Sequence, residues 1–123
     1  MKFTNTQKAP QAIGPYSQAV VVNGMVFSSG QIALKPNGEF LEGGVQEQCE
    51  QVLKNLKEVL EASGSSMDRV IKTTVYLVNM DDFTLVNEVY AKHFGDHKPS
   101  RSAVAVKTLP KNALVEIEAI GIV

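Results

Sequence analysis

The sequence predicts an α+β protein that forms one domain over residues 1–123, with two helices on one side of a β-sheet. Two observations predict this class. Strand-like runs flank an Asn-Gly turn near the N-terminus, and apolar residues recur at helical spacing in two later segments. A chain of 123 residues is long enough for one hydrophobic core and too short for two domains of ordinary size.

The first predicted strands cover residues 19–22 and 25–29. Asn23-Gly24 between them favours positive φ at both turn positions, which makes it the strongest local signal for a hairpin. We expect residues 30–33 to continue or bend the second strand, because a glycine within a strand often marks a bulge or a close backbone approach. The Pro-Asn-Gly sequence at residues 36–38 then predicts a turn.

A long amphipathic helix is predicted from Val45 to Ala62, with Gly64 as its stop. Its apolar positions recur at steps of three and four: Val45, Cys49, Val52, Leu53, Leu56, Val59 and Leu60. Cys49 is the only cysteine of the chain and falls on this stripe. We therefore expect it to be an inert thiol in the core.

A strand and a second helix follow. Residues 70–78 are rich in β-branched and aromatic side chains, which favours a strand. One side of that strand is expected to carry Ile71, Thr73, Val75 and Leu77. We expect Asp81 or Asp82 to cap a helix that runs to Phe94 and ends at Gly95. Its apolar stripe consists of Phe83, Val86, Val89, Tyr90 and Phe94.

Two final strand-like runs, residues 99–106 and 114–120, each alternate between apolar and charged or small residues. We expect them to pair antiparallel around a connection at residues 108–113, which would set Arg101 beside or diagonal to Glu118. The planar fork of arginine binds a carboxylate at two points, so this patch is suited to a small organic acid. The alternative is a solvated cross-strand ion pair that contributes only about 0.2–1 kcal/mol.

The sheet face away from the helices is predicted to be mixed in character. Its charged and aromatic members are expected to be Lys72, Tyr76, Arg101, Lys107, Glu116 and Glu118, among small or apolar neighbours. Such a face often packs against another subunit, so we expect a homo-oligomer with sites near its interfaces. Within that face, Glu116 is interpreted as a structural strand or interface charge.

Composition excludes several classes of function. The net charge of −1 and the scattered lysines give no basic surface for nucleic acid, so no nucleic-acid partner is expected. No apolar run is long enough for a membrane span, and the start lacks a signal-peptide pattern. Together with the single cysteine, this favours a cytoplasmic protein. His93 and His97 lack a third ligand and Gly95 interrupts their helix, so no metal is expected.

Several short motifs, taken together, carry a family resemblance. They are Ala12–Gln18, Ser28–Ile32, Lys72–Tyr76, Asn87–Tyr90, Pro99–Ser102, Leu109–Lys111 and Glu116–Glu118. In this order and spacing the chain resembles the RidA (YjgF) family of reactive intermediate deaminases over nearly its whole length. The resemblance implies a chorismate-mutase-like α+β fold with a mixed sheet, assembled as a homotrimer with ligand clefts between subunits.

The resemblance also implies an activity that needs no cofactor. Family members hydrolyse 2-imino acids, formed from enamines such as 2-aminoacrylate and 2-aminocrotonate, to 2-oxo acids and ammonia. Carried over to this chain, Arg101 holds the substrate carboxylate and Glu118 acts on the attacking water, as a general base or as its orienter. The substrate-binding positions implied are Tyr16, Gly30, Asn87, Arg101 and Ala103.

One position departs from the family pattern. Many members have cysteine where this chain has Ala103, so thiol-dependent properties of those relatives are not expected here. Deamination should persist, because the family uses the backbone N–H of that position to hold the acid. Two alternatives to an enzyme of this kind stay open: a non-catalytic module that binds 2-oxo acids, and a ribonuclease or translation inhibitor.

Overall fold

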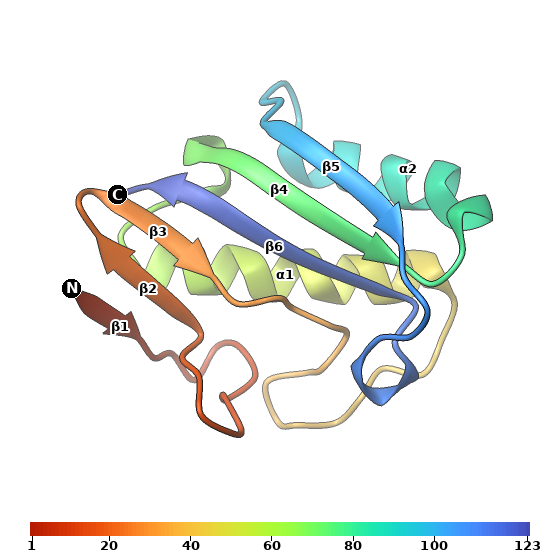
Figure 1. Cartoon of the computed structure of the whole chain (residues 1–123), viewed down its shortest axis with the longest axis horizontal. Helices are drawn as coiled ribbons and strands as arrows, with labels where there is room; N and C mark the ends of the chain where they lie inside the picture. Colours follow the sequence, from red (N-terminus) through yellow and green to blue (C-terminus); the bar gives the residue numbers. More distant parts are fainter.

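A six-stranded mixed sheet carries both helices on one of its faces (Figure 1). The computed structural model describes residues 1–123. The strands are β1 (Lys2–Thr4), β2 (Ala19–Val22), β3 (Met25–Ser28), β4 (Val70–Leu77), β5 (Ser100–Ala105) and β6 (Val115–Ile122), in the spatial order β1-β2-β3-β6-β4-β5. Only β4 and β5 pair in parallel. Neither helix is both long and apolar enough to cross a membrane.

The predicted hairpin is confirmed. Asn23 and Gly24 have φ angles of 51° and 73°, the positive values that a tight two-residue turn requires. Beyond β3 the chain leaves the regular ladder, yet Gln31 still bridges to Ile117 of β6. The loop after Gly30 therefore stays against the centre of the sheet, as the bend predicted at residues 30–33 implies.

Both predicted helices are also confirmed. Helix α1 spans Val45–Ala62 and α2 spans Phe83–Phe94, followed by glycines at 64 and 95 with positive φ. The start of α2 differs from the expectation, because neither aspartate caps it through its side chain. Instead, Asn79 accepts a hydrogen bond from the N–H of Asp81 and so begins a short 3-10 turn that leads into the helix.

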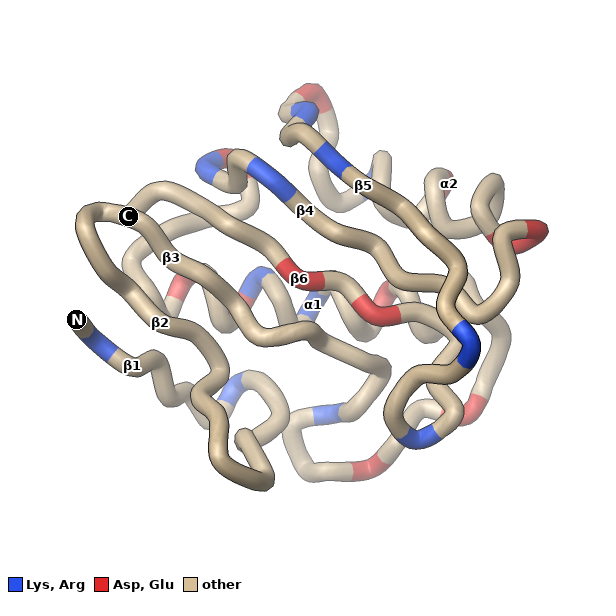
Figure 2. The backbone as a smooth tube through the Cα atoms, in the orientation of Figure 1, with Lys and Arg blue, Asp and Glu red and all other residues tan.

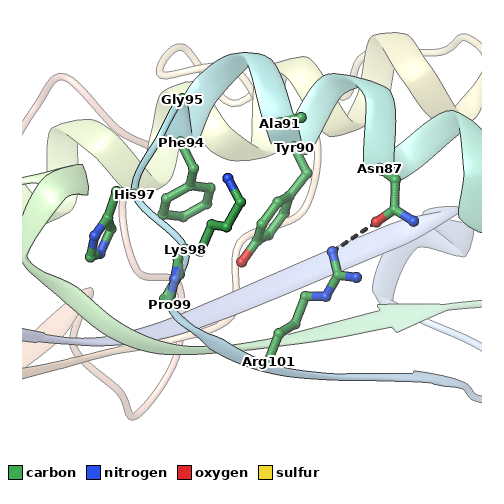
Figure 3. A pocket seen from close by; sticks show the side chains of 9 residues that line it. All are labelled: Asn87, Tyr90, Ala91, Phe94, Gly95, His97, Lys98, Pro99 and Arg101. Atoms are coloured by element: carbon green, nitrogen blue, oxygen red, sulfur yellow. Dashed lines mark hydrogen bonds between the residues drawn. The ribbon is translucent and has the colours of Figure 1, made fainter.

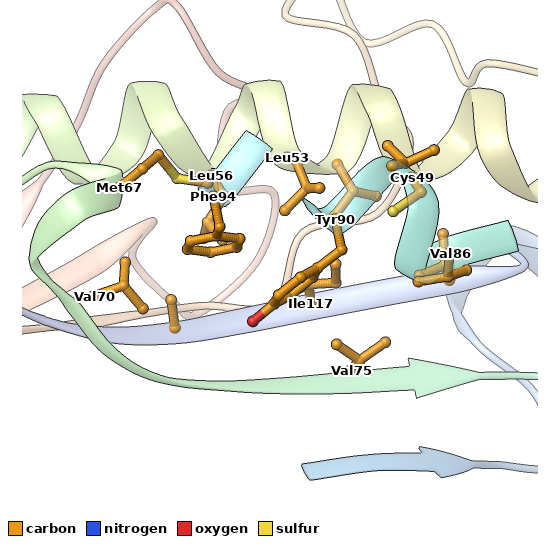
Figure 4. Packing of buried hydrophobic residues seen from close by; sticks show 14 of the residues in the cluster. Cys49, Leu53, Leu56, Met67, Val70, Val75, Val86, Tyr90, Phe94 and Ile117 are labelled. Carbon is orange, nitrogen blue, oxygen red and sulfur yellow. The ribbon is translucent and has the colours of Figure 1, made fainter. Parts of the chain in front are cut away.

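The core lies between the helices and the sheet (Figure 4). It joins the stripe of α1 to the inner positions of α2, β4 and β6, including Leu53, Leu56, Val75, Val86, Tyr90 and Ile117. Cys49 is fully buried there, and burial raises the pKa of its thiol to about 12. The cysteine is therefore an unreactive core residue, as predicted.

A bulge changes the expected face of one strand residue. The register between β4 and β6 shifts between Val70 and Lys72. Val70 consequently enters the core, whereas Ile71, predicted to share one side of the strand with Thr73, Val75 and Leu77, is 40% exposed. From Thr73 onward the predicted alternation holds, because Thr73, Val75 and Leu77 are all buried.

Replacing Leu56 by alanine is expected to reduce the free energy of unfolding by about 2–5 kcal/mol, through lost burial and the cavity left behind. Leu56 is fully buried at the centre of α1. The matched change Leu85→Ala, at an exposed leucine of α2, should cost about 0.5 kcal/mol or less. Urea unfolding of both variants measures the difference, and equal losses would contradict the assignment of the core.

The predicted pairing of the last two strands is wrong. Strand β4 lies between β5 and β6, pairing in parallel with β5 and antiparallel with β6 (Figure 1). The physical reason is the α2 connection, since a strand–helix–strand unit returns the second strand parallel to the first. Strand β1, which pairs with β2 and forms the far edge of the sheet, was not predicted.

The uncovered face of the sheet combines apolar and charged side chains. Cross-strand partners share a face, and Phe3, Val20, Phe27 and Ile120 form one such apolar row. Glu116 and Glu118 lie on this face in the middle of the sheet, where two acidic segments mark β6 in Figure 2. Arg101 does not lie on it, which corrects the prediction.

Candidate functional site

The Arg101 side chain lies against helix α2. Its Nη1 donates a hydrogen bond of 2.8 Å to Oδ1 of Asn87 (Figure 3). Its guanidinium carbon lies 4.8 Å from the centre of the Tyr90 ring and 5.2 Å from that of Phe83. Positions 83, 87 and 90 share one face of a helix, so three neighbouring side chains hold a single cation.

A cavity of about 480 Å³ begins at this guanidinium and follows the second half of α2 (Figure 3). Its lining is Asn87, Tyr90, Ala91, Phe94, Gly95, His97, Lys98, Pro99 and Arg101, with no acidic side chain. Asn87 occupies one N–H of the guanidinium, and an arginine has five. Donors therefore remain for an anion that enters from the cavity or from the edge of the sheet.

Strand β5 adds a backbone donor beside Arg101. The N–H of Val106 donates to the carbonyl of Leu77 on β4, at 2.7 Å. Since successive peptide groups of a strand point to opposite edges, the N–H of Ala103 points away from β4, toward the free edge of the sheet. A carboxylate at this edge can therefore meet both a guanidinium and a backbone N–H.

Tyr16 and Gly30 line a second cavity, of about 320 Å³. Pro10, Gln31, Lys111 and Glu116 also contribute to its wall. An added Cβ at Gly30 would lie 2.8 Å from Cδ of Glu116, so a larger residue here would displace the Glu116 side chain. The missing side chain therefore leaves room for that carboxyl group.

Glu118 lies on the uncovered face of β6, with Glu116 two residues before it and Tyr76 on the neighbouring strand. Burial raises the pKa of the Glu116 carboxyl, and the negative charge of Glu118 raises it further. Desolvation, followed by the Glu118 carboxylate, likewise raises the pKa of the Tyr76 phenol. Glu118, Glu116 and Tyr76 thus form one small group of acidic and phenolic side chains on the uncovered face.

Replacing Glu116 by glutamine should stabilise the protein at neutral pH. Because the native pKa of this carboxyl exceeds its usual 4.5, ionised Glu116 opposes folding once the pH rises through the native value. Well below pH 4.5 the residue is protonated in both the folded and the unfolded state, so the difference in stability between Glu116→Gln and the wild type should disappear. Melting temperatures at several pH values measure this, with the exposed Glu42→Gln as control. A difference in melting temperature between Glu116→Gln and the wild type that grows toward low pH would contradict the prediction.

Arg101 and Glu118 point to opposite faces of the sheet within one chain. Thr73 is directly opposite both Arg101 and Ala119 in the strand registers, and Thr73 and Ala119 are buried under the helices. Glu118 is next to Ala119 on β6 and therefore points the other way. The prediction that Arg101 lies beside or diagonal to Glu118 is wrong for a single chain.

The two histidines do not converge. Nε2 of His93 lies 2.8 Å from Oε1 of Glu50 on α1, and Nε2 of His97 lies 2.6 Å from the carbonyl of Val70. The chain contains no group of three histidine, cysteine or acidic side chains placed to hold a metal. Each histidine instead ties the end of α2 to a neighbouring element.

Sequence reasoning did not identify the aromatic support of Arg101. Phe83 and Tyr90 were assigned to the core stripe of α2, and Tyr90 does contribute to the core. The available signal was the spacing of Phe83, Asn87 and Tyr90, which repeats at four and three residues. That pattern indicates one continuous helix face, but it does not say which strand the face meets.

Comparisons with known proteins show the family of this chain. The model of the family described as Endoribonuclease L-PSP matches residues 6–123. The 2-iminobutanoate/2-iminopropanoate deaminase of Mus musculus is 49% identical over 122 residues, covering 98% of this chain and 90% of the mouse protein. A solved structure from Thermotoga maritima has a TM-score of 0.97 and 55% identity, and covers 100% of this chain and 98% of its own.

A third relative was solved with a ligand. The structure of Escherichia coli TdcF with bound serine has a TM-score of 0.95 and 44% identity, and covers 100% of this chain and 99% of that one. These matches run over essentially the whole chain. The protein therefore belongs to the RidA/YjgF family, and the resemblance carried by its short motifs is confirmed.

Proposed function

We propose that the protein is an imine deaminase that hydrolyses 2-imino acids to 2-oxo acids and ammonia, with 2-iminobutanoate and 2-iminopropanoate as substrates. The observation that carries this proposal is the Arg101 guanidinium, held by Asn87 and two aromatic rings beside a free backbone N–H. That arrangement suits a small carboxylate. The relative solved with serine supports the proposal, because serine presents the same carboxylate with a nitrogen on the adjacent carbon.

The working site is proposed to form between protomers of a homotrimer. Arg101 and Glu118 lie on opposite faces of one sheet, so a single chain cannot bring them to the same small substrate. The uncovered face offers apolar rows that a partner could bury. Arg101, Asn87 and Ala103 of one protomer would then meet Tyr16, Gly30 and Glu118 of another.

Each group has a defined role in the proposed reaction. Arg101 and the N–H of residue 103 hold the carboxylate, while Glu118 hydrogen-bonds the water that attacks the imine carbon. As the water oxygen bonds to that carbon, Glu118 takes a water proton and returns it to the nitrogen. Glu118 then carries the remaining hydroxyl proton to the same nitrogen, and the oxygen forms the carbonyl as the C–N bond breaks and ammonia leaves. Electrostatic positioning suffices for this hydrolysis, and no cofactor is invoked.

A coupled assay tests the proposal. A threonine dehydratase releases the enamine of 2-iminobutanoate, and added protein should accelerate the appearance of 2-oxobutanoate beyond the uncatalysed rate. The expected acceleration is lost with Arg101→Ala. If the protein binds 2-oxobutanoate but leaves the rate unchanged, the non-catalytic binding module is the better description.

The family description also raises the ribonuclease alternative. The net charge of −1 and the dispersed lysines and arginines argue against a phosphate-backbone surface (Figure 2). Repurified protein should therefore leave single-stranded RNA intact. Cleavage that disappears with Arg101→Ala would favour the ribonuclease instead.

A further inference from the structure

The inner aromatic ring that contacts Arg101 is itself fixed to the sheet. The Tyr90 hydroxyl lies 2.7 Å from Oγ1 of Thr73, and this pair of hydroxyls is buried. Thr73 is only 1% exposed and lies directly opposite Arg101 in the parallel register of β4 and β5. This hydrogen bond therefore ties the Tyr90 ring to β4, the strand next to β5, which carries Arg101.

This contact has a geometric consequence. A Tyr90 ring that is free to tilt would also move the face on which the Arg101 guanidinium stacks. The long Arg101 side chain would follow that movement, because it has several rotatable bonds. With the phenol held by Thr73, the ring keeps one orientation, and the guanidinium between Phe83, Asn87 and Tyr90 keeps one position. The nitrogen donors then point in a fixed direction before any ligand arrives.

We propose that Thr73 and Tyr90 are positioning residues for the carboxylate site: their buried hydrogen bond orients the ring that orients Arg101. Neither residue contacts substrate in this assignment, and both act through the guanidinium. The inference deepens the proposed deaminase function and rests on it for its kinetic readout. Its structural readout stands independently of turnover.

Two isosteric variants isolate the hydrogen bond. Tyr90→Phe keeps the ring, and Thr73→Val keeps the side-chain volume, so both should fold. Each is expected to raise KM about fivefold while kcat stays within about twofold, because a mobile guanidinium weakens carboxylate binding more than it alters the bound geometry. The double variant should match either single variant, since both changes break the same contact.

Thr4→Val is the matched control. Thr4 and Ser63 form another buried hydroxyl pair, with a separation of 2.6 Å, remote from Arg101. Removing it should leave KM unchanged. The proposal would be overturned if Thr4→Val raised KM as much as Thr73→Val, or if the two effects were additive in the double variant. Either result would indicate a general loss of rigidity in the protein instead.

NMR of the arginine side chains gives the second readout. The chain has only two arginines, and Nε of Arg69 donates to the carbonyl of Ile122, which makes Arg69 an internal reference. In Tyr90→Phe the order parameter of the Arg101 Nε–H should fall while that of Arg69 stays constant. Unchanged Arg101 order overturns the proposal even if the protein is a deaminase. If the wild type proves inactive, the proposed function fails and this signal alone decides the positioning role.

Discussion

Replacing Arg101 by alanine is expected to lower kcat/KM for 2-iminobutanoate by about two to three orders of magnitude and to leave a folded protein. Removing one member of a sheltered, hydrogen-bonded charge pair costs about 2–5 kcal/mol, which corresponds to losses of about thirtyfold to several thousandfold. Folding should persist, because Arg101 contributes nothing to the buried core and lies on an edge strand. The coupled dehydratase assay and circular dichroism measure the two properties.

Two further variants make that result specific. Arg101→Lys keeps the charge but should recover little activity, since an ammonium lacks the planar fork. Arg69→Ala removes the only other arginine of the chain, which precedes β4 and donates its Nε–H to the carbonyl of Ile122, and should retain wild-type kinetics. Wild-type kcat/KM in Arg101→Ala would contradict the assignment of the carboxylate site.

Replacing Glu118 by glutamine is expected to lower kcat by about 10²- to 10⁴-fold, the usual contribution of a general acid–base group. KM should change little, because the carboxylate of the substrate is held by Arg101 rather than by Glu118. Glutamine keeps the size and hydrogen-bonding reach of the side chain, so the loss reports on proton transfer. Initial rates over a range of substrate concentrations separate kcat from KM.

The acidic control for this change is Glu42→Gln, at an exposed position outside both cavities. It should leave kcat unaltered. If Glu118→Gln retains wild-type kcat, Glu118 does no more than orient water through a hydrogen bond that an amide can also make, and another base must be sought.

The local elements of the fold could be predicted from sequence because each has its own signal. The Asn23-Gly24 turn, the α1 stripe and the glycines after both helices depend on residues close together in the chain. The β5–β6 pairing failed because alternation says which residues share a face and not which strand lies alongside. The strand–helix–strand order of β4, α2 and β5 held the missing information, since it favours a parallel pair.

The candidate site could likewise be predicted only in part from the sequence. Short motifs identified Arg101 and Asn87, and the structure joins these two by a hydrogen bond. The relation of Arg101 to Glu118 was out of reach, because the face of a strand residue depends on which strand it joins and on what covers the sheet. Tyr90 was missed as a contact of Arg101 because an aromatic residue on an amphipathic stripe first indicates core, and here it belongs to both.

The central claim is that one site uses Arg101 from one protomer and Glu118 from another. Co-expression of Arg101→Ala and Glu118→Gln chains with different affinity tags, followed by tandem purification, yields mixed oligomers from two inactive parents. In a cyclic trimer of either mixed composition, one interface of the three joins an intact Arg101 to an intact Glu118, so about one third of wild-type activity should return. Mixed oligomers as inactive as both parents would contradict the account.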